Sequence, residues 1–125
     1  MIIDGELFFS NRQAITASGN TYSEKVIDLG AGGAAIGQEP SIVAVVNEAF
    51  VGSGNLSIYV ETSDNQTTWT QLHRAQALNA AALAKGAKVM DIRLMKDLKR
   101  YMRILYSTSA AFTAGKISVF VAKEV

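Results

Sequence analysis

The 125-residue sequence contains no cysteine, one histidine and one proline. Without cysteine the chain has no disulfide, no thiolate zinc site, no iron–sulfur cluster and no cysteine nucleophile. The single histidine, His73, leaves one imidazole as a general base and excludes histidine-rich metal sites. We therefore expect no catalysis, no metal and no cofactor, and the composition favours a binding or structural domain over an enzyme.

Long apolar runs and targeting signals are missing as well. No apolar run exceeds the five residues of 42–46, whereas a membrane-spanning helix takes about 20 residues. Asp4 and Glu6 stand where a secretory signal carries basic residues. We expect a protein made in the cytoplasm, with no membrane association. The length suits one domain, residues 1–125, that buries roughly two thirds of the surface of its unfolded chain.

The distribution of turn residues predicts an all-β fold. Clusters of Gly, Ser, Asn and Asp separate short segments that are rich in β-branched residues; they lie at 18–20, 30–37, 52–55 and 63–65. This rhythm is typical of an antiparallel sandwich or barrel. Apolar residues alternate with others in 56–61 and 117–121, which predicts strands with one face in a core. The continuous apolar run 42–46 predicts a strand covered on both faces.

Two regions fit this pattern less well. Residues 75–87 hold seven alanines and two leucines, a composition that favours a helix. Residues 88–106 fit either a helix with a stripe of Met90, Leu94 and Leu98, or two strands at 90–94 and 101–106 joined by a turn at Lys96 and Asp97. The aromatic and β-branched content of 101–108 favours the strands.

A glycine-rich stretch, Gly30 to Ala35, matches the dinucleotide-binding fingerprint after the apolar segment 26–29. That motif works by opening a helix whose amides hold a pyrophosphate. Gly37 and Pro40 would end any helix within two turns. We interpret the stretch as a loop between strands.

Residues 62–69, Thr-Ser-Asp-Asn-Gln-Thr-Thr-Trp, resemble the Asp-box hairpin of sialidases and other β-proteins, with Gln66 in place of its glycine. The resemblance predicts a hairpin in which Asp64 accepts hydrogen bonds from backbone amides and Trp69 packs over the turn. This is a structural device and not a catalytic one. His73 follows it without an orienting acid or a serine nucleophile, so we interpret it as a surface or interface residue.

The charges are divided unevenly along the chain. Residues 1–64 hold eight acids and two bases, a net charge of −6, while residues 65–125 hold ten bases and three acids, a net charge of +7. One interpretation is a basic surface that meets an acidic partner or another copy of the chain. The other interpretation is internal compensation: strands from the two halves of the chain interleave in a sandwich, so that their opposite charges alternate on its surface. The overall charge of +1 disfavours nucleic-acid binding.

Several short motifs, in this order and spacing, resemble the small jelly-roll capsid cement (decoration) proteins of tailed bacteriophages, a type first recognised in a Bordetella phage. The matching pieces are Met1 to Leu7, Gln13-Ala14-Ile15-Thr16, Ile27-Asp28-Leu29-Gly30, Glu39-Pro40, Glu61-Thr62-Ser63, Gly86-Ala87, Arg100 to Tyr106 and Thr113-Ala114-Gly115. They cover nearly the whole chain. Residues 95–99 depart from the family, which has a proline- and glycine-containing loop there.

The resemblance implies a single antiparallel jelly-roll β-sandwich of about eight strands. It implies a subunit on the outer surface of an icosahedral virion that stabilises the shell by bridging copies of the major capsid protein. We expect a homodimer or homotrimer, with no direct contact to nucleic acid. Partner contacts are expected near the N-terminus, at Leu7, Phe8 and Phe9. They are also expected in a basic stretch, which consists of Lys96, Lys99 and Arg100.

Two alternative functions use other features of the same sequence. The first is a carbohydrate- or receptor-binding sandwich of a phage tail, with Tyr59, Trp69, Tyr101 and Tyr106 as an aromatic platform. The second is a basic amphipathic helix at 88–106 that acts on a membrane or a partner groove.

Overall fold

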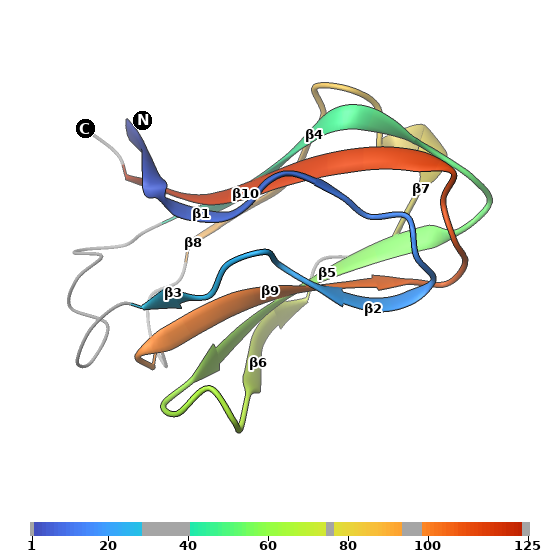
Figure 1. Ribbon diagram of the computed structural model, residues 1–125. Helices are drawn as coiled ribbons and strands as arrows, with labels where there is room; N and C mark the ends of the chain where they lie inside the picture. Colours follow the sequence, from blue (N-terminus) through green and yellow to red (C-terminus); the bar gives the residue numbers. More distant parts are fainter. Residues whose placement is uncertain (1, 29–40, 75–76, 94–98, 124–125) are drawn as a thin grey trace.

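The computed structural model describes residues 2–28, 41–74, 77–93 and 99–123 (Figure 1). Ten strands make up most of this part of the chain: β1 (Ile2–Ala14), β2 (Gly19–Tyr22), β3 (Ile27–Asp28), β4 (Ser41–Val51), β5 (Asn55–Ser63), β6 (Thr70–Arg74), β7 (Leu78–Asn79), β8 (Lys88–Arg93), β9 (Tyr101–Thr108) and β10 (Ala114–Lys123). None of the described residues forms an α-helix.

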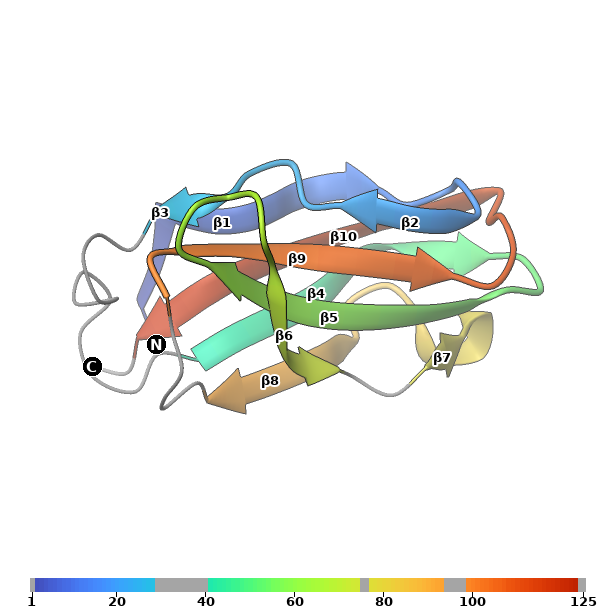
Figure 2. The ribbon, with the colours of Figure 1, turned by 90° about the horizontal axis from the view of Figure 1, so that it is seen from below.

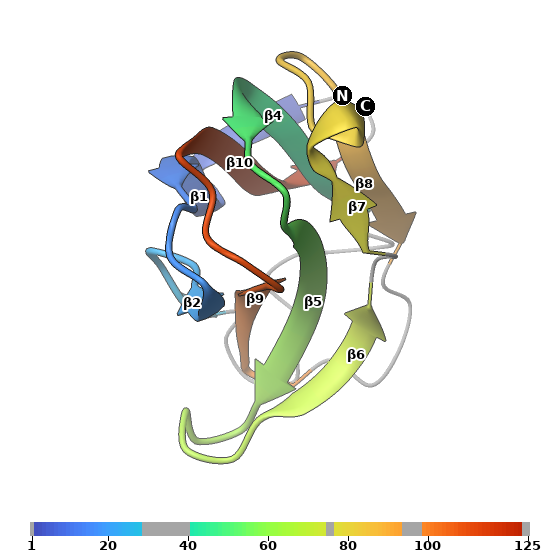
Figure 3. The same cartoon turned by 90° about the vertical axis from the view of Figure 1, so that its right-hand side faces the viewer.

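The strands form two antiparallel sheets that face each other (Figures 2 and 3). One sheet has the order β1-β10-β4-β8, and the other has the order β2-β9-β5-β6. The short strand β3 also pairs with β9, and β7 also pairs with β5. β2 and β3 occupy one strand position beside β9, and β6 and β7 occupy one beside β5. If the eight positions are numbered in chain order, the two sheets have the orders 1-8-3-6 and 2-7-4-5. These are the two sheets of a jelly roll, so the predicted fold is confirmed.

The predicted alternation positions the core. Leu56, Ile58 and Val60 of β5 are buried between the sheets, and so are their counterparts on β10, Ile117, Val119 and Val121. On β4, Ile42, Ala44 and Val46 join the same core. The intervening Val43 is 2% exposed and packs in a second cluster on the other side of its sheet. The prediction that 42–46 is covered on both faces is therefore confirmed.

The outer cluster of the four-stranded sheet consists of Phe8, Val43, Val45 and Phe120. The rings of Phe8 and Phe120 lie 5.1 Å apart, centroid to centroid, across the β1–β10 pair. Phe120 alternates with the core residues of β10, so its side chain points away from the core. It is nevertheless buried, because this cluster covers it.

The alanine-rich region is not a helix. After β7, residues Ala80–Ala82 form one 3-10 turn, capped by Asn79, whose Oδ1 accepts a hydrogen bond of 3.2 Å from the Ala82 amide. Alanine propensity alone is a weak determinant, because short isolated helices need an apolar face to bury. Among residues 77–87, Leu83 is the one fully buried residue, and the amides of Phe50 and Val46 on β4 donate to the carbonyls of Leu83 and Ala87.

The strand interpretation of 88–106 is confirmed, and the two strands do not pair with each other. Strand β8 pairs with β4 in one sheet, whereas β9 pairs with β2, β3 and β5 in the other. The two strands therefore cross between sheets, as jelly-roll topology requires. Lys96 and Asp97, the expected turn, lie outside the described residues.

Candidate interaction surface

The two phenylalanines expected near a partner lie on opposite sides of β1. Phe9 is fully buried in the core, so its side chain is not available to a partner and that expectation is corrected. Phe8 is half-buried on the outer face against Phe120. Period-two alternation causes this separation, since adjacent strand residues point to opposite faces. The backbone of Leu7 belongs to β1, but its side chain lies outside the described part.

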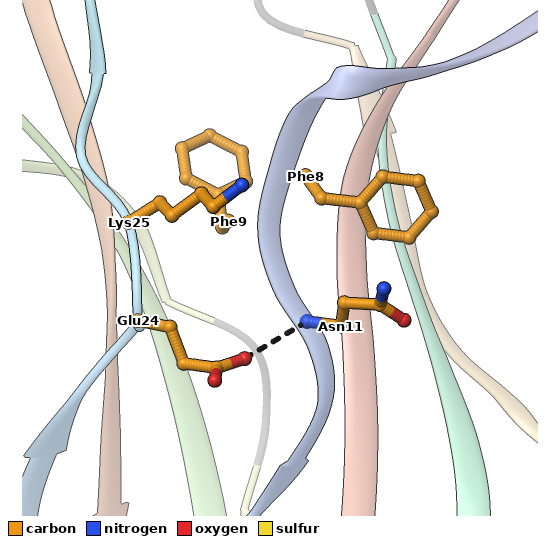
Figure 4. Close-up of a pocket in the computed structure, with 5 residues that line it drawn as sticks. All are labelled: Phe8, Phe9, Asn11, Glu24 and Lys25. Carbon is orange, nitrogen blue, oxygen red and sulfur yellow. Dashed lines mark hydrogen bonds between the residues drawn. The ribbon is translucent and has the colours of Figure 1, made fainter.

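A pocket of about 310 Å³ lies beside β1, lined by Phe8, Phe9, Asn11, Glu24 and Lys25 (Figure 4). The backbone amide of Asn11 donates to Oε1 of Glu24 at 3.1 Å, and the backbone amide of Lys25 donates to the Phe9 carbonyl at 3.0 Å. These bonds join β1 to the β2–β3 connection, and so join the edges of the two sheets. The backbone amides of Asn11 and Lys25 and the Glu24 carboxylate thus take part in closing the sandwich.

A buried polar network lies behind this edge. The Ser10 hydroxyl donates to Oε1 of Gln13 at 2.6 Å and lies 2.7 Å from the Tyr106 hydroxyl. Because Ser10 has one proton and Gln13 Oε1 only accepts, Tyr106 donates to Ser10. Burial between the sheets raises the pKa of Tyr106 well above its usual range.

The described cations of the basic stretch are already paired. The Arg100 guanidinium makes two hydrogen bonds of 3.0 Å to the carboxylate of Asp28 and lies 5.1 Å from the ring centroid of Tyr101. The hydrogen bonds and charge of Asp28 raise the pKa of Arg100 further above its ordinary value. Lys99 Nζ lies 3.9 Å from Oδ2 of Asp64. Lys96 lies outside the described residues.

A third cation, Arg103, is the centre of a cluster that sequence reasoning missed. Its Nε donates to Oε1 of Glu61 at 2.8 Å, and its guanidinium lies 4.0 Å from the ring centroid of Tyr22 and 4.1 Å from that of Trp69. The cluster joins β2, β9, β5 and the β5–β6 connection on the outer face. Glu61 and Arg103 are directly opposite in the β5–β9 register, but the sequence alone does not pair those strands.

The pairing explains the uneven charge along the chain. Among the described residues, four of five ion pairs join an acid of 1–64 to a base of 65–125: Glu61–Arg103, Asp28–Arg100, Asp64–Lys99 and Glu48–Lys116. The interpretation as internal compensation is therefore confirmed for these groups. Jelly-roll topology produces it by alternating early and late strands within each sheet.

The predicted hairpin at 62–69 is confirmed, since β5 and β6 pair from Tyr59–Arg74 to Thr62–Thr70. Its turn is stabilised by Asn65 and not by Asp64: Asn65 Oδ1 accepts from the amides of Thr67 at 2.8 Å and Thr68 at 2.9 Å. The Asp64 side chain is 75% exposed. Gln66 has φ +60°, the conformation that the glycine of the Asp-box pattern would adopt.

The remaining candidates give no chemical site in the described part of the chain. His73 is half-buried on β6, opposite Val60. The described residues include no group of three or more His, Asp or Glu side chains placed to hold a metal. They also include no helix long and apolar enough to cross a membrane. The glycine-rich stretch 30–35 lies outside the described residues.

Comparison with known proteins identifies a family. No curated protein matches the chain. The model of the Bbp16 family matches residues 9–121. Bbp16 is a family name from Bordetella phage. The matched part begins within β1 and ends within β10. This match covers both sheets. The chain therefore belongs to the Bbp16 family of bacteriophage proteins.

Proposed function

We propose that the protein is a capsid cement protein that binds the outer surface of an icosahedral phage shell. In this role it bridges neighbouring copies of the major capsid protein and needs neither catalysis nor a cofactor. The observation that carries the proposal is that residues 9–121 match the model of a phage protein family. The chain also has both sheets of a jelly roll. The same architecture occurs in viral capsid domains.

The mechanism is stabilisation by many repeated contacts. Each subunit adds a modest binding free energy, and the shell repeats it at every equivalent position, so that separation of two capsid subunits requires several contacts to break together. Further copies of the chain, as a homodimer or homotrimer with closed symmetry, would extend each bridge. Phe8, Lys99 and Arg100 remain candidate contacts, because their side chains are partly exposed.

The alternative function, sugar binding on an aromatic platform, has less support. Tyr106 is fully buried in the core. Tyr59 and Tyr101 lie half-buried, and Trp69 carries the Arg103 guanidinium against its ring. A sugar platform needs free ring faces, which these residues do not offer together.

The direct test is reconstitution with shells assembled without this protein. We expect the purified chain to co-sediment with these shells, to decorate their outer surface in electron micrographs, and to raise the temperature at which they disassemble. Bovine serum albumin at equal concentration is the control. If the chain neither sediments with shells nor changes their disassembly temperature, the cement function is wrong.

A further inference from the structure

The β5–β6 hairpin is the element that extends farthest from the sandwich on the side of the six-stranded sheet (Figures 1 and 3). Regular pairing ends at Thr62 and Thr70. The five tip residues 64–68 are all exposed. A projecting tip of this kind can enter a recess in a neighbouring protein before the flat sheet face reaches it.

Two side chains fix the tip from within. Ser63, which is fully buried, accepts through its Oγ from the amides of Asn65 at 3.1 Å and Gln66 at 2.9 Å. Its hydroxyl donates to Oδ1 of Asn65 at 3.0 Å, and that oxygen also accepts from the amides of Thr67 and Thr68. Four consecutive amides of the tip, those of residues 65–68, therefore have a side-chain partner.

The sheet fixes the hairpin from outside. Trp69, at the base of the tip, lies against Arg103, which Glu61 and Tyr22 hold from other strands. At the opposite base, Thr62 Oγ1 accepts from the Lys99 amide and donates to the Tyr101 carbonyl, both at 2.9 Å. The tip is therefore rigid although it is exposed, and a rigid element loses little conformational entropy on binding.

The tip also holds a strained residue among its exposed positions. Gln66 adopts φ +60°, which costs a side-chain-bearing residue about 1 kcal/mol where glycine would cost nothing. Among the described residues its side chain has no hydrogen-bond partner, while its backbone amide is held by Ser63. Residues in such conformations occur preferentially at functional sites. The side chain of Gln66 is thus exposed to solvent on a backbone whose position is fixed.

Apart from Asp64, the chemistry of the tip is neutral hydrogen bonding. Gln66, Thr67 and Thr68 supply an amide and two hydroxyls. The Asp64 carboxylate is paired with Lys99, whose Nζ lies 3.9 Å from its Oδ2, and the other described ion pair nearby joins Glu61 to Arg103. Net attraction to a strongly acidic or basic partner is therefore weak, whereas short-range hydrogen bonds remain available.

We propose that the hairpin tip 64–68 is the shell-contacting element and that it docks into a polar, uncharged recess of the major capsid protein. This inference rests on the proposed function. It assigns recognition to hydrogen bonds and shape, and not to the basic stretch. Because neutral hydrogen bonds are little affected by ionic strength, the affinity should change less than about threefold between 50 and 500 mM salt.

The test uses the full chain and a triple variant, Gln66→Gly with Thr67→Ala and Thr68→Ala. Glycine suits the positive φ of residue 66, and alanine at 67 and 68 keeps the backbone amides that donate to Asn65 Oδ1. Thr67→Ala removes one further bond, from the Thr67 hydroxyl to the Asn65 carbonyl, which is long at 3.4 Å. The circular dichroism spectrum should therefore match the wild type. Loss of three side-chain hydrogen bonds should weaken binding to cement-free shells by at least about 30-fold, on the order of a few-fold to tenfold for each bond.

The matched control is Ser18→Ala with Ser53→Ala, which removes two exposed hydroxyls from loops at the opposite end of the sandwich. It should bind like the wild type. If the triple variant also binds like the wild type, the tip assignment is overturned while the cement function stands. Wild-type affinity that falls more than tenfold with salt would overturn the neutral recess. If the wild type does not bind shells at all, both the tip assignment and the cement function are overturned.

Discussion

The two ends of the sandwich are built in different ways. One end holds the β5–β6 connection, the start of β9, the start of β1 and the end of β10 (Figure 1). This end is held by the ion pairs of Arg100 with Asp28 and of Arg103 with Glu61, and by the contacts of the two guanidinium groups with aromatic rings. The other end consists of the β1–β2, β4–β5 and β9–β10 connections, and residues 15–19, 51–55 and 107–115 contain no charged residue.

Backbone bonds close the uncharged end. The Phe112 amide donates to the Thr16 carbonyl at 3.0 Å, and the Thr113 amide donates to that of Val51 at 2.8 Å. Phe50 and Phe112 meet edge to face, with ring centroids 5.1 Å apart. A Cβ on Gly54 would lie 2.5 Å from the Ala110 carbonyl oxygen. The uncharged end is therefore close-packed at Gly54 and Gly115, where an added Cβ meets atoms 2.5 Å away, whereas the charged end is held by ion pairs and ring contacts between side chains.

The largest effect should come from Gly115→Ala, at the uncharged end. The new Cβ would lie 2.5 Å from the Phe50 ring, and φ is +148°. We expect a loss of about 3 kcal/mol in the free energy of unfolding, from overpacking together with backbone strain. Urea denaturation measures it.

Gly86→Ala is the matched control, because Gly86 also has positive φ, +85°, but open space around its Cβ position. Strain alone should cost about 1 kcal/mol there. Equal losses for the two variants would contradict the close packing inferred at Gly115.

At the charged end, Arg103→Ala should cost about 2 kcal/mol. The Glu61 side chain is 9% exposed and would lose its cation, while Trp69 and Tyr22 would lose the group between them. The additional change Glu61→Gln should recover part of the loss, because it removes the unpaired buried charge. Additive losses in the double variant, measured by thermal unfolding, would show that the pair is not coupled.

The smallest effect lies between the ends, at Tyr106, and appears only in alkali. Its pKa is raised in the folded state, whereas the unfolded chain ionises near pH 10. Below pH 10 both states keep the proton. Above pH 10 the unfolded state releases it first, so stability should fall by about 1.4 kcal/mol per pH unit from this group.

Urea denaturation of the wild type and Tyr106→Phe at pH 9, 10 and 11 isolates this contribution, since the other tyrosines are common to both proteins. The difference between the two should change in favour of the variant above pH 10. A difference that is constant with pH would show that Tyr106 is not held neutral by burial.

The sequence predicted the strands more successfully than their contacts. The alternation at 56–61 and 117–121 identified core faces, because period-two patterning is local. The alanines of 75–87 misled, because helix propensity is weak without a face to bury. Phe9 was expected at a partner surface. Of the neighbours Phe8 and Phe9, however, it is Phe9 that points into the core. Among the predicted contacts, Lys96 and the side chain of Leu7 lie outside the described residues.

The sequence by itself determined an all-β domain with a hairpin at 62–69, since turn residues and alternation act over a few positions. Only the tertiary structure decided that Arg103 lies between Tyr22 and Trp69 and that Asn65 and not Asp64 organises the turn. It also decided that four described acids of 1–64 pair with bases of 65–125. The physical reason is strand order. A jelly roll places segments from distant parts of the chain side by side, and such pairs leave no signal in the local sequence.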